Sequence, residues 1–134
     1  FNYFKKDFDV VIGSRRVKGA RLLKRQPKTR EILGKGFTLL VRMLIDSRIK
    51  DATCGFKAFK NKTAKEIFSK VSIYDWAFDA EILFLANKLN KKYAQAPVIW
   101  SDVKGSQVRL RKDVLRSLFG LVKIRLNDIQ GKYS

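Results

Sequence analysis

The chain has 134 residues, of which 46% are hydrophobic, which is enough for about one domain with a modest core. It carries 30 Lys and Arg against 12 Asp and Glu, and this net charge of +18 implies an anionic partner such as nucleic acid, acidic lipid or a phosphorylated substrate. Histidine is absent and Cys54 is the single cysteine, which excludes an intrachain disulfide, the usual zinc ligand sets and catalysis by a His base.

The first half of the chain predicts a buried strand, a basic loop, a long helix and a second short strand. Residues 8–12 form an apolar run typical of a buried strand, and residues 13–26 are a loop crowded with Lys and Arg. Pro27 suits a helix start, and apolar side chains recur at helical spacing over residues 28–45. Residues 53–59 alternate enough to form a short strand.

The second half predicts two helices, a strand and a final helix. Thr63 and Glu66 have the spacing of a capping box and indicate the start of a helix. Residues 79–89 are rich in Leu, Ile and Ala and predict the next helix. Residues 94–100 predict a strand, and residues 112–129 predict a basic final helix.

The predicted order, β, α, β, α, α, β, α, indicates an α/β or α+β fold with a thin sheet of three strands. Such a sheet has an exposed edge, so we expect the chain to be a fragment of a larger domain. The chain does not begin with Met, which favours the same interpretation. No run of about 18 apolar residues occurs, so no transmembrane helix is expected.

Four segments together resemble the second half of a family 2 glycosyltransferase. They are residues 9–15 (DVVIGSR), 51–59 (DATCGFKAF), 76–83 (WAFDAEIL), and the weaker match of 98–100 (VIW) followed by Gly105 and Ser106. Their order and spacing are similar to those of polyprenyl-phosphate (dolichyl-phosphate) glucosyltransferases, over about residues 7–126. Each motif alone is only moderately specific, whereas the combination in this order is specific.

The resemblance implies a partial GT-A-type (Rossmann-like) α/β fold, in which a mostly parallel sheet is flanked by helices. Residues 1–110 would be the C-terminal half of that domain and residues 111–134 a basic amphipathic helix. The family holds its nucleotide-sugar and a Mg²⁺ or Mn²⁺ ion in the N-terminal half, through an Asp-x-Asp motif. Asp7 and Asp9 match this pattern but directly precede the Gly-Ser-Arg strand, so we interpret them as an accidental match. We expect no metal on this chain, and no activity from it alone.

Arg15 and Arg30 are candidate phosphate ligands, and Arg16 is a further candidate after them. Arg15 follows a strand end and a glycine, and its planar fork can bind two phosphate oxygens. The resemblance gives Arg30 the same role, and Ser106 belongs to a loop that contacts phosphate in the family. Gln107 departs from a Lys that is frequent in the family, which puts the contact from that loop in doubt. The alternative is that Arg15 and Arg30 are solvated surface cations. Replacing Arg15 by Ala is expected to lower activity greatly and to leave the fold intact.

Asp79 is the candidate catalytic residue. In related enzymes an Asp at this place deprotonates an acceptor hydroxyl, but a phosphate acceptor is already largely ionised near neutral pH, so Asp79 could instead orient the acceptor or bind the sugar. The alternative is an N-cap aspartate. The resemblance places Asp51 and Thr53 in the wall of the acceptor and sugar pocket. Gly55 would let a backbone come close. Trp76 could stack on a sugar or pack in the core, and Glu81 could hold a loop arginine or serve as a first-turn helix anion.

The resemblance implies transfer of a sugar, expected to be glucose, from a UDP-glucose-like donor to a lipid phosphate. The expected partners are that donor, the lipid phosphate, an anionic membrane surface and the missing N-terminal half; nucleic acid is not expected. The expected location is the cytoplasmic face of the endoplasmic reticulum in a eukaryote or of the plasma membrane in a prokaryote. The last helix carries Leu115, Phe119, Val122 and Leu126 at helical spacing among cations, which suits either an anionic membrane or packing on its own domain.

Two other functions remain open on the sequence alone. One is a basic nucleic-acid-binding module, which the charge permits but for which no known motif is present. The other is a non-catalytic membrane-surface protein built on the last helix. The apolar segment with its acidic residues at 76–83 favours the transferase, because a nucleic-acid surface has no need of it.

Overall fold

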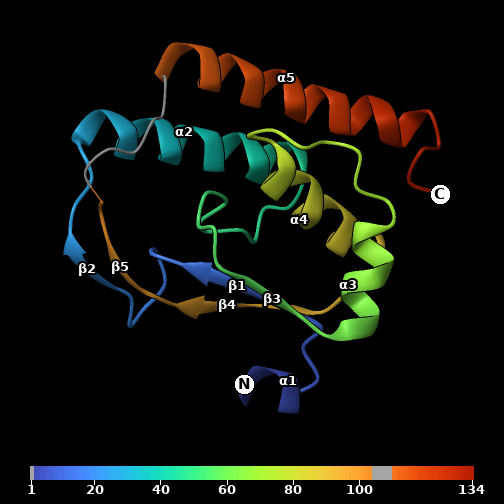
Figure 1. The fold of residues 1–134 in the computed structure, drawn as a ribbon, viewed down its shortest axis with the longest axis horizontal. Helices are drawn as coiled ribbons and strands as arrows, with labels where there is room; N and C mark the ends of the chain where they lie inside the picture. The colour runs from blue at the N-terminus through green and yellow to red at the C-terminus, as the bar shows by residue number, and fades with distance from the viewer. Residues whose placement is uncertain (1, 104–109) are drawn as a thin grey trace.

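Two small sheets and a layer of helices make up the computed structural model, which describes residues 2–103 and 110–134 (Figure 1). In chain order the elements are α1 (Asn2–Lys5), β1 (Val10–Ser14), β2 (Arg21–Lys24), α2 (Lys28–Leu44), β3 (Lys57–Phe59), α3 (Asn61–Phe68), α4 (Phe78–Lys88), β4 (Tyr93–Pro97), β5 (Ile99–Ser101) and α5 (Leu110–Ile129). The predicted mixed α/β class is confirmed. In the part of the chain that the structure describes, no helix is long and apolar enough to cross a membrane.

β1 is the central strand of the larger sheet and is buried along its whole length. It pairs antiparallel with β3, with Val10 opposite Phe59, and parallel with β4, with Val10 opposite Tyr93. Only Val98 separates β4 from β5, which pairs in parallel with β2 in a second, two-stranded sheet. The carboxyl end of β1 therefore lies beside the point where the chain passes from one sheet to the other.

The hydrophobic core lies between the larger sheet and helices α2 and α4, and α5 packs over both helices (Figure 1). Val10 and Ile12 contribute to it from β1, and Val41 from α2. The middle of α4 is buried on all sides, from Ala80 to Ala86. This helix lies in the core, and the residues just before it and in its first turn face the cavity described below.

One face of α5 belongs to this core, and the opposite face is exposed. Leu121 and Ile124 are buried, and Gly120 lies against Ala77. The exposed face carries five apolar side chains at helical spacing, here termed the α5 stripe: Leu115, Phe119, Val122, Leu126 and Ile129. The buried face matches the interpretation that this helix packs on its own domain, and the exposed face matches the interpretation that it binds an anionic membrane.

Three expectations about elements were wrong. Residues 21–24, assigned to a loop, form the fully exposed strand β2. The capping box does not form: Lys60 is the N-cap of α3, no side chain caps it, and Thr63 is buried inside the helix. The single strand at 94–100 is two strands that belong to different sheets. The three-stranded sheet is confirmed, but a second sheet accompanies it.

Candidate functional site

A cavity of about 570 Å³ opens at the carboxyl end of β1, between the first half of α2 and the start of α5. One wall is apolar and comprises Ile32, Leu33, Phe37 and Leu40 of α2 with Val114 and Leu118 of α5. The rest of the lining includes polar and aromatic side chains, some of them on the same two helices: Arg15, Arg30, Thr53, Trp76, Asp79, Trp100, Asp113 and Ser117. Five of the predicted site residues, distant in sequence, therefore line one cavity: Arg15, Arg30, Thr53, Trp76 and Asp79.

Arg15 is held by a carboxylate that lies 36 residues further along the chain. Its Nε and Nη2 donate to the two carboxylate oxygens of Asp51, each at 2.8 Å, and its backbone N–H donates to Oδ2 at 3.0 Å. Nη2 also donates to Thr53 Oγ1 at 2.6 Å, and the guanidinium lies 5.2 Å from the centroid of the Trp100 ring. The fork predicted to bind phosphate is thus occupied by protein, and Arg15 organises the site.

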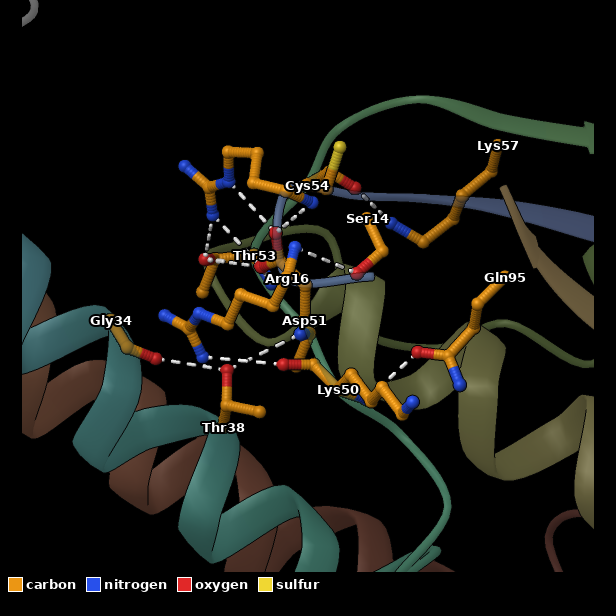
Figure 2. A network of polar contacts seen from close by, with 12 residues as sticks. Ser14, Arg16, Gly34, Thr38, Lys50, Asp51, Thr53, Cys54, Lys57 and Gln95 are labelled. Carbon is orange, nitrogen blue, oxygen red and sulfur yellow. Dashed lines mark hydrogen bonds and ion pairs between the residues drawn. The ribbon is translucent and has the colours of Figure 1, made fainter. Parts of the chain in front are cut away.

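Asp51 is fully buried and is the anchor of this network (Figure 2). Burial acts to raise the pKa of its carboxyl, but the hydrogen bonds and the charge of Arg15 outweigh burial and hold that pKa below its ordinary value. Asp51 also accepts from the backbone N–H of Thr53, and the backbone N–H of Ala52 donates to Thr38 on α2. The loop that carries Asp51 and Thr53 is therefore tied to both β1 and α2.

Asp79 lies in the first turn of α4 and reaches the cavity with a partner that sequence reasoning missed. The N-cap of α4 is Ala77, so the N-cap interpretation of Asp79 is wrong. Its Oδ1 forms an ion pair of 2.9 Å with Nζ of Lys57, whose side chain is only 5% exposed. Nζ also donates to the carbonyl of Cys54 at 2.9 Å. Lys57 stands in the DATCGFKAF segment, so two of the recognised motifs meet through this pair.

Arg30 and Trp76 line the cavity from α2 and from the loop before α4. Arg30 pairs with Asp102 just after β5, with Nη1 and Oδ1 3.3 Å apart. Trp76 is 48% exposed, so it is not a core residue, and its ring is accessible to a ligand. Asp113, which is buried at the start of α5, adds a carboxylate that the sequence did not single out.

Two predicted site residues, Glu81 and Gly55, lie elsewhere. Glu81 is fully buried, where it accepts from the backbone N–H groups of Ser72 and Ile73 and, at 2.5 Å, from the hydroxyl of Tyr133. Glu81 holds no loop arginine, because α4 is buried here and the Glu81 side chain points into the protein interior. A Cβ placed on Gly55 would meet no atom within 4 Å, so no backbone comes close there. Ser106 lies outside the described residues.

The Asp-x-Asp pattern at residues 7–9 is engaged by lysines. Asp7 pairs with Lys60 at 3.3 Å and with Lys92 at 2.9 Å, and Asp9 pairs with Lys60 at 3.2 Å. These pairs lie at the start of β1, at the opposite end of that strand from Arg15. Among residues 2–103 and 110–134, no group of three or more His, Cys, Asp or Glu side chains is placed to hold a metal ion.

The sequence did not assign several parts of the site as site residues, among them Lys57, Trp100, Asp113 and the apolar wall. Lys57 and Trp100 stand inside recognised segments, which was the available signal. The residues of the apolar wall follow an ordinary amphipathic pattern in the sequence, and only the fold shows that their side chains line an open cavity. An apolar wall that ends at arginines and carboxylates suits an amphiphilic ligand with a hydrocarbon part and a charged or hydroxylated part. The fold and site thus define an α/β protein whose main cavity has both apolar and charged lining residues.

Comparison with known proteins agrees with this description. The dolichyl-phosphate beta-glucosyltransferase of Dictyostelium discoideum is 38% identical over 133 aligned residues, which cover 90% of this chain and 41% of that protein. The proteins of that name from Saccharomyces cerevisiae and Homo sapiens are 36% and 31% identical, each over 92% of this chain and over 37% and 38% of their own lengths. No protein-family model matches. The resemblance stated from the sequence is confirmed, and the chain spans about two fifths of the length of these relatives.

Proposed function

We propose that this chain is part of an enzyme that transfers glucose from a UDP-glucose-like donor to dolichyl phosphate. The observation that carries the proposal is the similarity, over nine tenths of the chain, to proteins named for that reaction. The cavity also supports it, because five residues chosen on the resemblance, four of them from the motifs, converge there beside an apolar wall. A nucleic-acid-binding module would not need such a wall.

Within this proposal the cavity receives the acceptor. The first isoprene units lie along Phe37, Leu40 and Leu118, and the phosphate reaches the polar end near Arg30 and Thr53. A phosphate oxygen forms a bond to the anomeric carbon of glucose as the bond between that carbon and the diphosphate of UDP breaks. Since a phosphate monoester has a second pKa of about 6, the nucleophile is already ionised near neutral pH. Asp79, fixed by Lys57, then orients the sugar or the acceptor through its hydroxyls.

The remaining parts of the enzyme follow from the resemblance alone. The chain would complete a GT-A-type domain, with residues 1–110 as its C-terminal half, and a preceding segment would bind the nucleotide and a Mg²⁺ or Mn²⁺ ion. That ion would offset the charge of the leaving diphosphate. The enzyme would act at the cytoplasmic face of a membrane, the endoplasmic reticulum in a eukaryote or the plasma membrane in a prokaryote.

The α5 stripe supports the membrane part of the proposal. Its five apolar side chains are exposed, and the exposed cations Lys112, Arg116 and Lys123 stand on the same helix. A basic amphipathic face of this kind binds anionic bilayers through apolar insertion and charge attraction. Residues 111–134 would then have two contacts, the core on one side and the lipid on the other.

The test uses the complete protein that contains this chain, in membranes, with UDP-glucose labelled in the sugar and with dolichyl phosphate. We expect label in a lipid that releases glucose under mild acid, and about a hundredfold less of it with Asp79→Ala. The matched control is Asp128→Asn, which removes a carboxylate that is paired to Lys88 but does not line the cavity. Absence of labelled lipid, or equal losses in both variants, would contradict the proposal.

A further inference from the structure

A second, smaller cavity of about 220 Å³ adjoins the first, and Arg15, Gln26 and Trp100 line both. Four cations and one carboxylate surround it: Arg15, Arg16, Arg25 and Lys35, with Glu31. It combines the end of β1, the segment after β2 and the first two turns of α2. None of the residues selected from the motifs except Arg15 belongs to it.

The charges around this cavity do not balance. Arg15 is neutralised by Asp51, and Lys35 pairs with Glu31 at 2.8 Å. Among the residues that the structure describes, no carboxylate lies within ion-pair distance of Arg16 or Arg25. The positive charges of Arg16 and Arg25 are therefore not neutralised by an ion pair at this cavity.

Arg16 is the better placed of the two. It is partly buried, its backbone N–H donates to Ser14 Oγ at 3.2 Å, and Nη1 donates to the carbonyl of Lys50 at 3.3 Å (Figure 2). The guanidinium lies beside Gly34, where a Cβ would be 3.7 Å from Nη2. Burial lowers the pKa of Arg16 and the charge of Arg15 acts in the same direction, whereas the charges of Asp51 and Glu31 oppose this shift without outweighing it. A partly desolvated cation without a counter-ion is stabilised by a bound anion.

We propose that this cavity binds a phosphate group, with Arg16 as its principal ligand and Arg25 as the second. In the proposed transferase, on which the identity of the ligand rests, that group belongs to the donor diphosphate, or to the lipid phosphate if the latter binds here instead of near Arg30 and Thr53. Arg16 and Arg25 then do what the sequence assigned to Arg15, whose Nε and Nη2 already donate to Asp51 and Thr53.

The experiment measures binding of inorganic pyrophosphate to this chain by calorimetry, in buffer of low and of raised salt. We expect one saturable site, and binding at least about tenfold weaker in Arg16→Gln and in Arg25→Gln, since each loses a charge-assisted contact. The matched control is Arg42→Gln: Arg42 also donates to one backbone carbonyl, that of Ser47, but lines neither cavity. Circular dichroism verifies that each variant folds. Arg25 is exposed, so the Arg25→Gln variant is not expected to misfold.

Competition identifies the source of the phosphate. Displacement of pyrophosphate by UDP alone assigns the cavity to the donor, and displacement by a short prenyl monophosphate alone assigns it to the acceptor. Displacement by neither ligand overturns the proposal, as do absent binding and equal weakening in Arg42→Gln, which would mean that the net charge attracts anions nonspecifically. Because no glucose is transferred in this assay, these failures leave the transferase proposal standing.

Discussion

Arg15 and Asp51 form the most enclosed ion pair that lines the candidate site, with side chains 11% and 0% exposed. Removing one partner of such a pair leaves the other charge buried without compensation. We therefore expect Arg15→Ala to lower the free energy of unfolding by about 3 kcal/mol, measured in urea at neutral pH. This differs from the expectation, drawn from the sequence, that the substitution would affect activity and leave the fold intact.

The same variant has a pH signature. The pKa of Asp51 is lowered in the folded state, so the pair stabilises the fold above the unfolded pKa of about 3.9 and loses this contribution as pH falls through the lower folded value. The gap in stability between wild type and Arg15→Ala should be widest near neutral pH and should narrow below about pH 4. A gap that stays constant in acid would mean that Asp51 is not held ionised by Arg15.

At the scale of single elements, the attachment of α5 depends on one close approach. A Cβ on Gly120 would lie 2.1 Å from Cβ of Ala77, the buried residue at which α4 begins. Although Ala favours a helix, this overlap has to be relieved by moving α5 away from α4. We expect Gly120→Ala to destabilise the fold by about 1–3 kcal/mol.

Gly36 provides the control for that prediction. It also lies inside a helix, α2, but a Cβ there would meet no atom within 4 Å. Gly36→Ala should therefore stabilise the protein by about 0.5–1 kcal/mol through helix propensity. Opposite signs for the two substitutions in thermal unfolding would support the packing of α5 on α4, and stabilisation by both would refute it.

The elements differ in how far the sequence predicts them. The start of α2 after Pro27 and its length follow from local signals, namely a fixed proline dihedral and a helical apolar pattern. β2 has no such signal: its residues are basic or apolar and all exposed, and it is a strand because β5 pairs with it. The site is likewise only partly predictable from the sequence, because its contacts join residues that are distant along the chain. Motifs located Arg15, Asp51 and Asp79, but sequence spacing does not reveal that Arg15 binds Asp51 or that Lys57 binds Asp79.

At the scale of the whole molecule, the net charge of +18 and the α5 stripe act on the same proposed partner, an anionic bilayer. Charge attraction brings the protein to the surface, and insertion of exposed apolar side chains then fixes which face meets the lipid. Charge attraction alone would not determine which face of the protein contacts the bilayer. An apolar side chain of α5 and an equally exposed one elsewhere should therefore differ in their effect on membrane binding.

Phe119 on α5 and Leu23 on β2 are both 72% exposed, and they lie on distant parts of the fold (Figure 1). We expect Phe119→Ser to weaken binding to vesicles containing phosphatidylserine by about tenfold in sedimentation, because about 1.5 kcal/mol of apolar transfer is lost. Leu23→Ser should leave binding nearly unchanged, and both variants should unfold within about 0.5 kcal/mol of wild type because the side chains are exposed. Equal weakening in the two variants would show that the α5 stripe does not face the membrane. If raised salt abolishes binding of the wild type and of both variants, the interaction is electrostatic only.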